Sequence, residues 1–120
     1  AHDLIARAAA LGAALGRKLR DSLGDLPAVG DVRGIGMVWA VEFVADRQTR
    51  EPFPAGAHFA DRVCARAMDL GVLFYPGHGG ADGVRGDHLL IAPPSVVTEA
   101  ELDAIVQTLR QAILEEMNSQ

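Results

Sequence analysis

The sequence predicts an α+β fold in which helices cover one face of a small, mostly antiparallel sheet. Apolar residues recur at spacings of three and four near both ends of the chain, which is typical of amphipathic helices. Short β-rich runs lie between glycine- and proline-containing segments, and the resulting order is α-β-β-α-β-β-α. With 120 residues and neither repeats nor a linker, the chain is suited to one domain with a single core.

The first helix is expected over residues 3–23, and Gly24 and Pro27 end it. Its apolar stripe consists of Leu4, Ile5, Ala8, Leu11, Leu15, Leu19 and Leu23. Two glycines inside the helix, Gly12 and Gly16, each cost about 1 kcal/mol relative to alanine. They indicate either close packing against another backbone or a soft segment.

Two β-rich runs follow, at residues 29–33 and 37–44, around a Gly-Ile-Gly turn that suits a hairpin or a bulged strand. In the second run apolar residues occupy both alternating sets of positions, with Glu42 as the exception. This pattern predicts a strand that is covered on both faces. A proline-punctuated loop then leads to a second helix over residues 57–70, which Gly71 ends.

The last part of the chain predicts two more strands and a helix. Residues 72–76 (VLFYP) indicate a buried strand, residues 77–87 a glycine-rich loop, and residues 88–94 (HLLIAPP) a strand that the prolines stop. Thr98 and Glu101 form a T-x-x-E capping box that opens the final helix. The stripe of this helix consists of Leu102, Ile105, Val106, Leu109, Ile113 and Met117.

Charge and composition narrow the classes of partner. The formal net charge of -5 disfavours nucleic acid, and no apolar run approaches the roughly 20 residues that a membrane span needs. The single cysteine, Cys64, allows no internal disulfide and fits a reducing cytosol, so a cytoplasmic location is expected. The first residues lack the features of a secretory signal and an initiator methionine, so we expect a processed chain or a piece of a longer one.

Two features could indicate a functional site, a glycine pattern and the single cysteine, but a structural role is the better explanation for each. Gly34-x-Gly36 begins like a dinucleotide fingerprint, but Trp39 stands where the third glycine belongs and a strand follows where a helix is required. A turn or a close backbone approach is the better explanation for these glycines. Cys64 lies on an apolar helix stripe, where a cysteine is expected to be inert packing.

A metal site in the glycine-rich loop is also considered. His78, Asp82, Asp87 and His88 lie within eleven residues and carry groups that zinc accepts. Their spacing matches no compact metal motif, so we expect a solvated loop or loop-closing hydrogen bonds, and no metal.

The basic residues give the most informative candidates. Lys18 is the only lysine and lies among arginines on the polar side of the first helix, where a solvated charge is expected rather than the buried amine that a Schiff base needs. Arg85, beside glycines at the mouth of a strand, can present its planar guanidinium to a carboxylate. Arg33 is a weaker candidate for the same role, and a surface ion pair is the alternative for both arginines.

The stretches VGDVRGIGMVWAVEFV and GDHLLIAPPSVVTEAELD resemble the C-terminal small-domain segment of class III (omega-type) aminotransferases. The resemblance covers nearly the full chain, so residues 1–120 are expected to form that small domain, without the large cofactor domain. It implies pyridoxal phosphate as the cofactor of the full-length enzyme. It also implies transfer of an amino group from an amine or amino acid to a keto acid, a large cofactor-binding domain as partner, and a homodimer.

The resemblance points to Arg85 as the substrate-binding residue. Some relatives have an arginine three places before the first proline, where this chain has Leu90, and Arg85 is the nearest match to the arginine that others carry farther upstream. Weaker candidates for the pocket are Tyr75, His78 and His88. The family's Schiff-base lysine, its pyridine-nitrogen aspartate and its phosphate loop have no match, and Lys18 cannot replace the lysine. The chain alone is therefore expected to supply no catalytic residue, to bind no cofactor and to be inactive.

A second class of function stays open at this point. A free-standing α+β module could bind a small acid through the same loop, or the chain could serve only in dimerisation. Both alternatives share the fold expected above and differ from the first in needing no cofactor.

Overall fold

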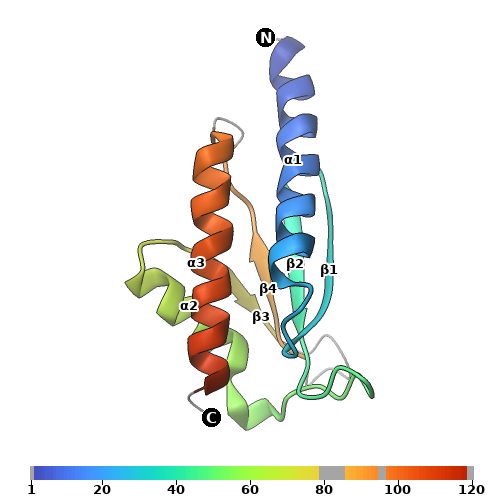
Figure 1. The fold of residues 1–120 in the computed structure, drawn as a ribbon, viewed down its shortest axis with the longest axis vertical. Helices are drawn as coiled ribbons and strands as arrows, with labels where there is room; N and C mark the ends of the chain where they lie inside the picture. Colours follow the sequence, from blue (N-terminus) through green and yellow to red (C-terminus); the bar gives the residue numbers. More distant parts are fainter. Residues whose placement is uncertain (1, 79–85, 95–96, 119–120) are drawn as a thin grey trace.

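Three helices pack against one face of a four-stranded sheet in the described part of the chain (Figure 1). The structure is a computed structural model and describes residues 2–78, 86–94 and 97–118. The elements in order are α1 (His2–Leu23), β1 (Val29–Ile35), β2 (Val38–Phe43), the 3-10 helix η1 (Ala55–Ala57), α2 (Phe59–Asp69), β3 (Tyr75–Gly77), β4 (His88–Ile91) and α3 (Glu99–Asn118). The α+β class and the order of elements are confirmed.

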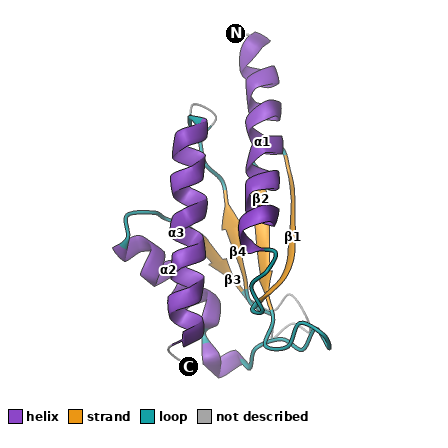
Figure 2. Cartoon of the chain, viewed as in Figure 1, coloured by secondary structure: helices purple, strands orange, loops and turns teal. Residues whose placement is uncertain are grey.

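The sheet is antiparallel throughout, in the order β1-β2-β4-β3 (Figure 2). β1 and β2 form a hairpin, and their register shifts between Val29 and Asp31, so the hairpin also contains a bulge. The turn of this hairpin includes Gly36 in the left-handed conformation, with a φ of 57°. This is a conformation that glycine adopts at little cost. The expectation of a turn at these glycines is confirmed.

The helices meet the sheet through large buried side chains. Leu15 and Leu19 of α1, Leu109 of α3 and Val41 of β2 are fully buried in one core. Phe59 at the start of α2 lies between two aromatic rings. Its ring centroid is 4.5 Å from that of Phe53 in a stacked pair and 5.1 Å from that of Phe43 in an edge-to-face pair. Such ring pairs add to the stabilisation that burial alone provides.

The other face of the sheet carries no helix within the described residues, and we call it the open face. It is formed by Asp31, Arg33 and Ile35 of β1, Val38, Ala40 and Glu42 of β2, His88 and Leu90 of β4, and Tyr75 and Gly77 of β3. Along β2 burial alternates, with Trp39 buried and Val38 50% exposed. The prediction that β2 is covered on both faces is therefore wrong for the described residues, because the helices cover one side only.

Two further sequence predictions need correction. Residues 72–76 do not form a buried strand: β3 begins only at Tyr75, and Leu73 and Tyr75 are 58% and 53% exposed. β3 pairs only with β4 and lies at the edge of the sheet, which explains its exposure. In α1 the apolar stripe continues past the core, since Ile5 is 79% exposed while Leu11 is buried.

The final helix begins as the sequence indicates. The backbone N–H of Glu101 donates to Thr98 Oγ1 at 3.1 Å, and the N–H of Thr98 donates to Glu101 Oε1 at 2.9 Å. These hydrogen bonds with Thr98 hold the pKa of the Glu101 carboxyl below its usual value. The reciprocal pair is the capping box that satisfies two backbone donors at the start of α3.

The glycines of α1 allow a close approach to the β1–β2 hairpin. A Cβ on Gly12 would lie less than 3.0 Å from the carbonyl of Gly36, and one on Gly16 less than 3.0 Å from the ring of Trp39. The indole of Trp39 in turn donates its N–H to the Gly36 carbonyl at 3.0 Å. Of the two explanations left open by the sequence, close packing against another backbone is the correct one for Gly12.

We expect Gly12→Ala to lower the free energy of unfolding by about 1–2 kcal/mol, because overpacking against a rigid carbonyl outweighs the roughly 1 kcal/mol gained in helix propensity. Urea denaturation followed by circular dichroism measures this. The control Gly56→Ala adds a Cβ with nothing within 4 Å and should change stability by less than about 0.5 kcal/mol. A stabilised Gly12→Ala variant would instead mark a soft helix segment.

Candidate functional site

The loop between β3 and β4 is the predicted substrate-binding region. Arg85, its principal candidate, lies outside the described residues, as does Asp82. The structure does describe both ends of the loop, at His78 on one side and at Gly86, Asp87 and His88 on the other. The geometry of these ends can therefore be examined directly.

Tyr75 and His88 lie on the open face. Tyr75 pairs with Leu90 and Gly77 pairs with His88 across the β3–β4 ladder, so these side chains point to the same side. A Cβ on Gly77 would lie less than 3.0 Å from the imidazole of His88, which shows that the ring lies directly over the Gly77 backbone. Tyr75 is 53% exposed, so the structure places two of the predicted pocket residues on one accessible surface.

His78 lies on the helix side of the sheet, away from Tyr75 and His88. Its Nε2 is 3.3 Å from Asp61 Oδ2 on α2, and its Nδ1 is 3.5 Å from Asp87 Oδ1. The imidazole thus bridges one end of the loop to the other and to α2. The three weaker pocket candidates do not form one group, and His78 has a loop-closing role.

Asp87 is the anchor of this region. The sequence predicted a solvated loop or loop-closing hydrogen bonds for the group of residues that contains it, and it did not indicate the partners on α2 and β2 that the structure shows. Asp87 is 4% exposed, and its Oδ2 accepts the backbone N–H of Ala60 at 2.9 Å. Its own carbonyl accepts the N–H of Phe43 at 2.9 Å. Asp87 therefore joins the start of α2, the end of β2 and the start of β4.

A signal for this role exists in the sequence. The N-cap of α2 is His58, whose φ is 51° and whose side chain makes no capping hydrogen bond. Without a Ser, Thr, Asp or Asn at this position, the first N–H groups of the helix need an acceptor from elsewhere in the chain. The buried Asp87, directly before β4, meets that need.

Arg33 is occupied by carboxylates of its own chain. Its Nη1 lies 2.9 Å from Asp31 Oδ2 and 2.8 Å from Glu42 Oε2. The hydrogen bond to Glu42, and then that to Asp31, raise the pKa of the Arg33 guanidinium. The ion-pair alternative is correct for Arg33 in this structure.

Lys18 is also paired. Its Nζ lies 2.7 Å from Asp103 Oδ1 and 3.8 Å from Glu99 Oε1, so the ammonium joins α1 to α3. This contact, together with its partly exposed position on α1, gives Lys18 a structural role. The residue is not placed in a desolvated pocket such as a Schiff-base lysine requires.

Cys64 is buried in the core between α2 and its neighbours. Burial, and then the nearby Asp61 carboxylate, raise the pKa of the Cys64 thiol to about 11. A thiol of this kind is a poor nucleophile at neutral pH, because the thiolate is the reactive form. The expectation that Cys64 is inert packing agrees with this environment.

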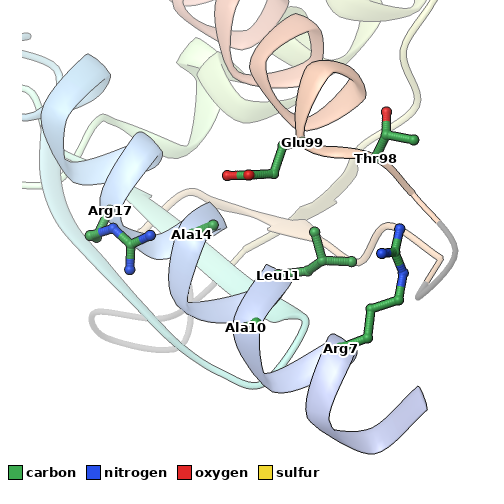
Figure 3. Close-up of a pocket in the computed structure, with 7 residues that line it drawn as sticks. All are labelled: Arg7, Ala10, Leu11, Ala14, Arg17, Thr98 and Glu99. Atoms are coloured by element: carbon green, nitrogen blue, oxygen red, sulfur yellow. The ribbon is translucent and has the colours of Figure 1, made fainter. Parts of the chain in front are cut away.

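A hollow of about 670 Å³ lies between α1 and the start of α3 (Figure 3). Arg7 extends from α1 toward Thr98 in this view, and its guanidinium donates to the Val97 carbonyl at 3.1 Å. None of the predicted pocket residues lines this hollow. It lies on the helix side of the protein, so we do not assign it to substrate.

Two classes of site are not found in the described ranges. Groups of three or more His, Cys, Asp or Glu side chains arranged to hold a metal ion do not occur among residues 2–78, 86–94 and 97–118. Within the same ranges, no helix has the length and apolar character required to cross a membrane.

Comparison with known proteins gives the family. Residues 1–113 match the model of aminotransferase class III. An uncharacterized aminotransferase of Schizosaccharomyces pombe is 39% identical over 92% of this chain, which spans 24% of that relative. A transaminase structure from directed evolution by ancestral reconstruction aligns with a TM-score of 0.85 and 36% identity, covering 98% of this chain and 24% of its own. A transaminase of the marine bacterium Virgibacillus aligns with a TM-score of 0.89 and 27% identity, and the alignment covers 98% of this chain and 26% of that transaminase.

The fold, with helices on one side of a four-stranded antiparallel sheet, is thus one that known transaminases contain. This chain belongs to the class III aminotransferase family. It spans about a quarter of the length of the relatives and structures that it matches.

Asp87→Ala should lower the free energy of unfolding by about 1–3 kcal/mol, because the Ala60 N–H loses its acceptor in a buried place. Asp87→Asn keeps an acceptor oxygen and should cost less. Asp69→Ala, an exposed aspartate at the other end of α2, is the control and should have little effect. Equal stability of all three variants in urea denaturation would show that the Asp87 contact contributes nothing.

We expect iodoacetamide to modify Cys64 far more slowly in the folded chain than in urea at pH 8. With a pKa of about 11, only roughly one thiol in a thousand is ionised at that pH, and burial blocks access as well. Mass spectrometry over a time course measures the difference. Equal rates in the folded and denatured chain would contradict this account of the thiol.

Proposed function

We propose that this chain is the C-terminal small-domain part, over residues 1–120, of a pyridoxal phosphate-dependent aminotransferase. The reaction is transfer of an amino group from an amine or amino acid to a keto acid. The observation that carries the proposal is the match of residues 1–113 to the class III family, together with the quarter-length coverage of transaminase chains. No comparison supports the alternative of a free-standing binding or dimerisation module.

The residues of this chain do not fit the cofactor by themselves. The single lysine of the sequence, Lys18, is held by Asp103 and Glu99, and no other amine side chain is present to bond the cofactor aldehyde. Pyridoxal phosphate supplies electron-sink chemistry when it is bound. We place its binding in the large domain of the full-length protein and derive no step of the reaction from this chain.

The proposed contribution of this chain is to hold substrate. Arg85 would bind the carboxylate of the keto acid or amino acid through its guanidinium, a geometry that arginine suits better than lysine. Support comes from the described ends of the loop, which the His78–Asp87 contact and the buried Asp87 carboxylate fix to α2. Tyr75 and His88 lie beside these ends on the open face, where they would border the same substrate.

We also propose a homodimer of the full-length enzyme and a cytoplasmic location. The family resemblance supports the homodimer, and the single cysteine of this chain supports the cytoplasmic location. Sedimentation of the full-length protein tests the first of these.

The proposal as a whole is tested on the full-length protein. We expect it to carry pyridoxal phosphate, visible as cofactor absorbance, and to convert a keto acid to an amino acid in the presence of an amine donor. A full-length protein that holds no pyridoxal phosphate after reconstitution would overturn the proposal.

Arg85→Ala in the full-length enzyme should raise KM for substrates with a carboxylate by roughly 10–100-fold, because a charge-assisted hydrogen-bond pair is lost. Substrates without a carboxylate should be affected little. The matched control Arg17→Ala removes an exposed arginine of α1 and should leave both classes unchanged. Steady-state kinetics with paired substrates measures the effect, and an equal loss for both classes would rule out carboxylate recognition by Arg85.

A further inference from the structure

His78 lies between two carboxylate groups from separate parts of the chain. Its Nε2 is 3.3 Å from Asp61 Oδ2 on α2, and its Nδ1 is 3.5 Å from Asp87 Oδ1 directly before β4. Asp87 is buried and accepts the Ala60 N–H with its other oxygen, which fixes that carboxylate in place. Both ring nitrogens of His78 thus face carboxylate oxygens.

The two contacts together need one more proton than a neutral histidine carries. A neutral imidazole has one N–H donor and one acceptor nitrogen, whereas an imidazolium has two donors, and an ionised carboxylate only accepts. In the neutral ring, one nitrogen lone pair would therefore face a carboxylate oxygen and be repelled by it. One additional proton makes both contacts attractive, whether His78 or the adjacent Asp87 carboxylate holds it.

Other charged groups near this cluster come from α2 and α3. His58, the N-cap of α2, has its Nδ1 3.6 Å from Asp61 Oδ2, the same oxygen that faces His78. Arg62, the next residue of α2, has its Nη1 3.0 Å from Glu116 Oε1 on α3. The contact of His58 stays within the start of α2. The contacts of His78, in contrast, join α2 to both described ends of the β3–β4 loop.

The additional proton is exchangeable with solvent, because the side chain of His78 is 48% exposed. In ordinary surroundings histidine is the side chain that changes its charge between about pH 5 and pH 8. The strength of the two contacts should therefore depend on pH in this range, with both present at the acidic end and one of them lost at the alkaline end.

We propose that His78 is a positioning residue whose additional proton ties the β3–β4 loop to α2, and this rests on the function proposed above. With the proton bound, the ring holds Asp61 and Asp87 together. Without it, the described ends of the loop are held less firmly. Since Arg85 belongs to the same loop, a substrate carboxylate should bind more tightly in the protonated state. Apparent affinity scales with the fraction of protein in the binding-competent state.

The first test is the pH dependence of KM in the full-length enzyme. The KM for a keto acid is divided by the KM for a neutral ketone, because this ratio cancels titrations that affect both substrates. We expect the ratio to rise about threefold between about pH 6 and about pH 8.5, as for the loss of one partly exposed ionic contact. In His78→Gln, which cannot take up the proton, the ratio should stay near its alkaline value at both pH values.

Two further variants separate the proton from the contact itself. In Asp61→Asn the amide can donate to the unprotonated ring nitrogen, so neutral His78 keeps both partners and the ratio should stay near its acidic value throughout. The control His58→Asn removes the other histidine beside Asp61 and should retain the wild-type rise. Asparagine tolerates the left-handed backbone of position 58. A flat ratio in the wild type, or a wild-type rise in His78→Gln, would overturn the proposal.

Hydrogen–deuterium exchange of the full-length protein tests the tie without substrate. After correction for intrinsic rates, peptides that include Asp87 and His88 should exchange about threefold faster at about pH 8.5 than at about pH 6 in the wild type, and equally at both in His78→Gln. Equal corrected rates in the wild type would contradict the tie. Failure of the proposed function would instead appear as missing cofactor absorbance with this exchange difference intact, so the two failures are distinguishable.

Discussion

Burial of apolar helix side chains against a single face of the sheet holds the described elements in place. The stripes of α1 and α3 and the aromatic start of α2 all point inward to the same side of β2 and β4. Because interiors are packed as densely as organic crystals, each helix position constrains the others. One-sided packing also leaves the other face of the sheet without a helix among the described residues. Tyr75 and His88 lie on that face.

Asp87 and His78 hold the described ends of the β3–β4 loop. Asp87 contacts α2 through Oδ2 and β2 through its carbonyl oxygen, and its Oδ1 meets His78 from the opposite end of the loop. Both described ends of the loop are thus fixed to neighbouring elements. Such an arrangement suits a side chain that must meet substrate at a set position, and functional residues on loops are commonly positioned by rigid elements in this way.

Helix and strand types could be predicted from the sequence because they depend on local periodicity and capping. The α3 capping box, the β1–β2 hairpin and the order of elements follow from patterns within about twenty residues. The predictions were wrong where exposure or a contact depends on elements elsewhere in the chain. β3 is exposed because it lies at the edge of the sheet. One side of β2 is exposed because helices cover only one face of the sheet. The sequence of a single strand determines neither of these features. Hydrogen bonds that close the loop were among the expectations for Asp87, but its partner on α2 was not, because the N–H that it accepts belongs to Ala60, which is distant in sequence.

The same distinction between local pattern and distant contacts applies to the candidate functional residues. For Lys18 the sequence predicted only a solvated charge, because its partners Asp103 and Glu99 lie on α3, far along the chain. For Arg33 a surface ion pair was one of two alternatives, and the structure shows it. His78 could not be separated from His88 before the sheet was known, since a residue's side of a strand depends on register. The family resemblance rests on two short stretches, which contain a glycine turn, a proline pair and a capping box.

The long first helix has a mechanical implication. α1 has 22 residues and so extends about 33 Å, and its first turns project beyond the sheet in Figure 1. Gly12 and Gly16 fix its middle against the hairpin at Gly36 and Trp39. Because α-helices curve only gently without proline or a π-bulge, these contacts set the direction of the whole helix. The projecting turns of α1 therefore keep a fixed orientation relative to the β1–β2 hairpin.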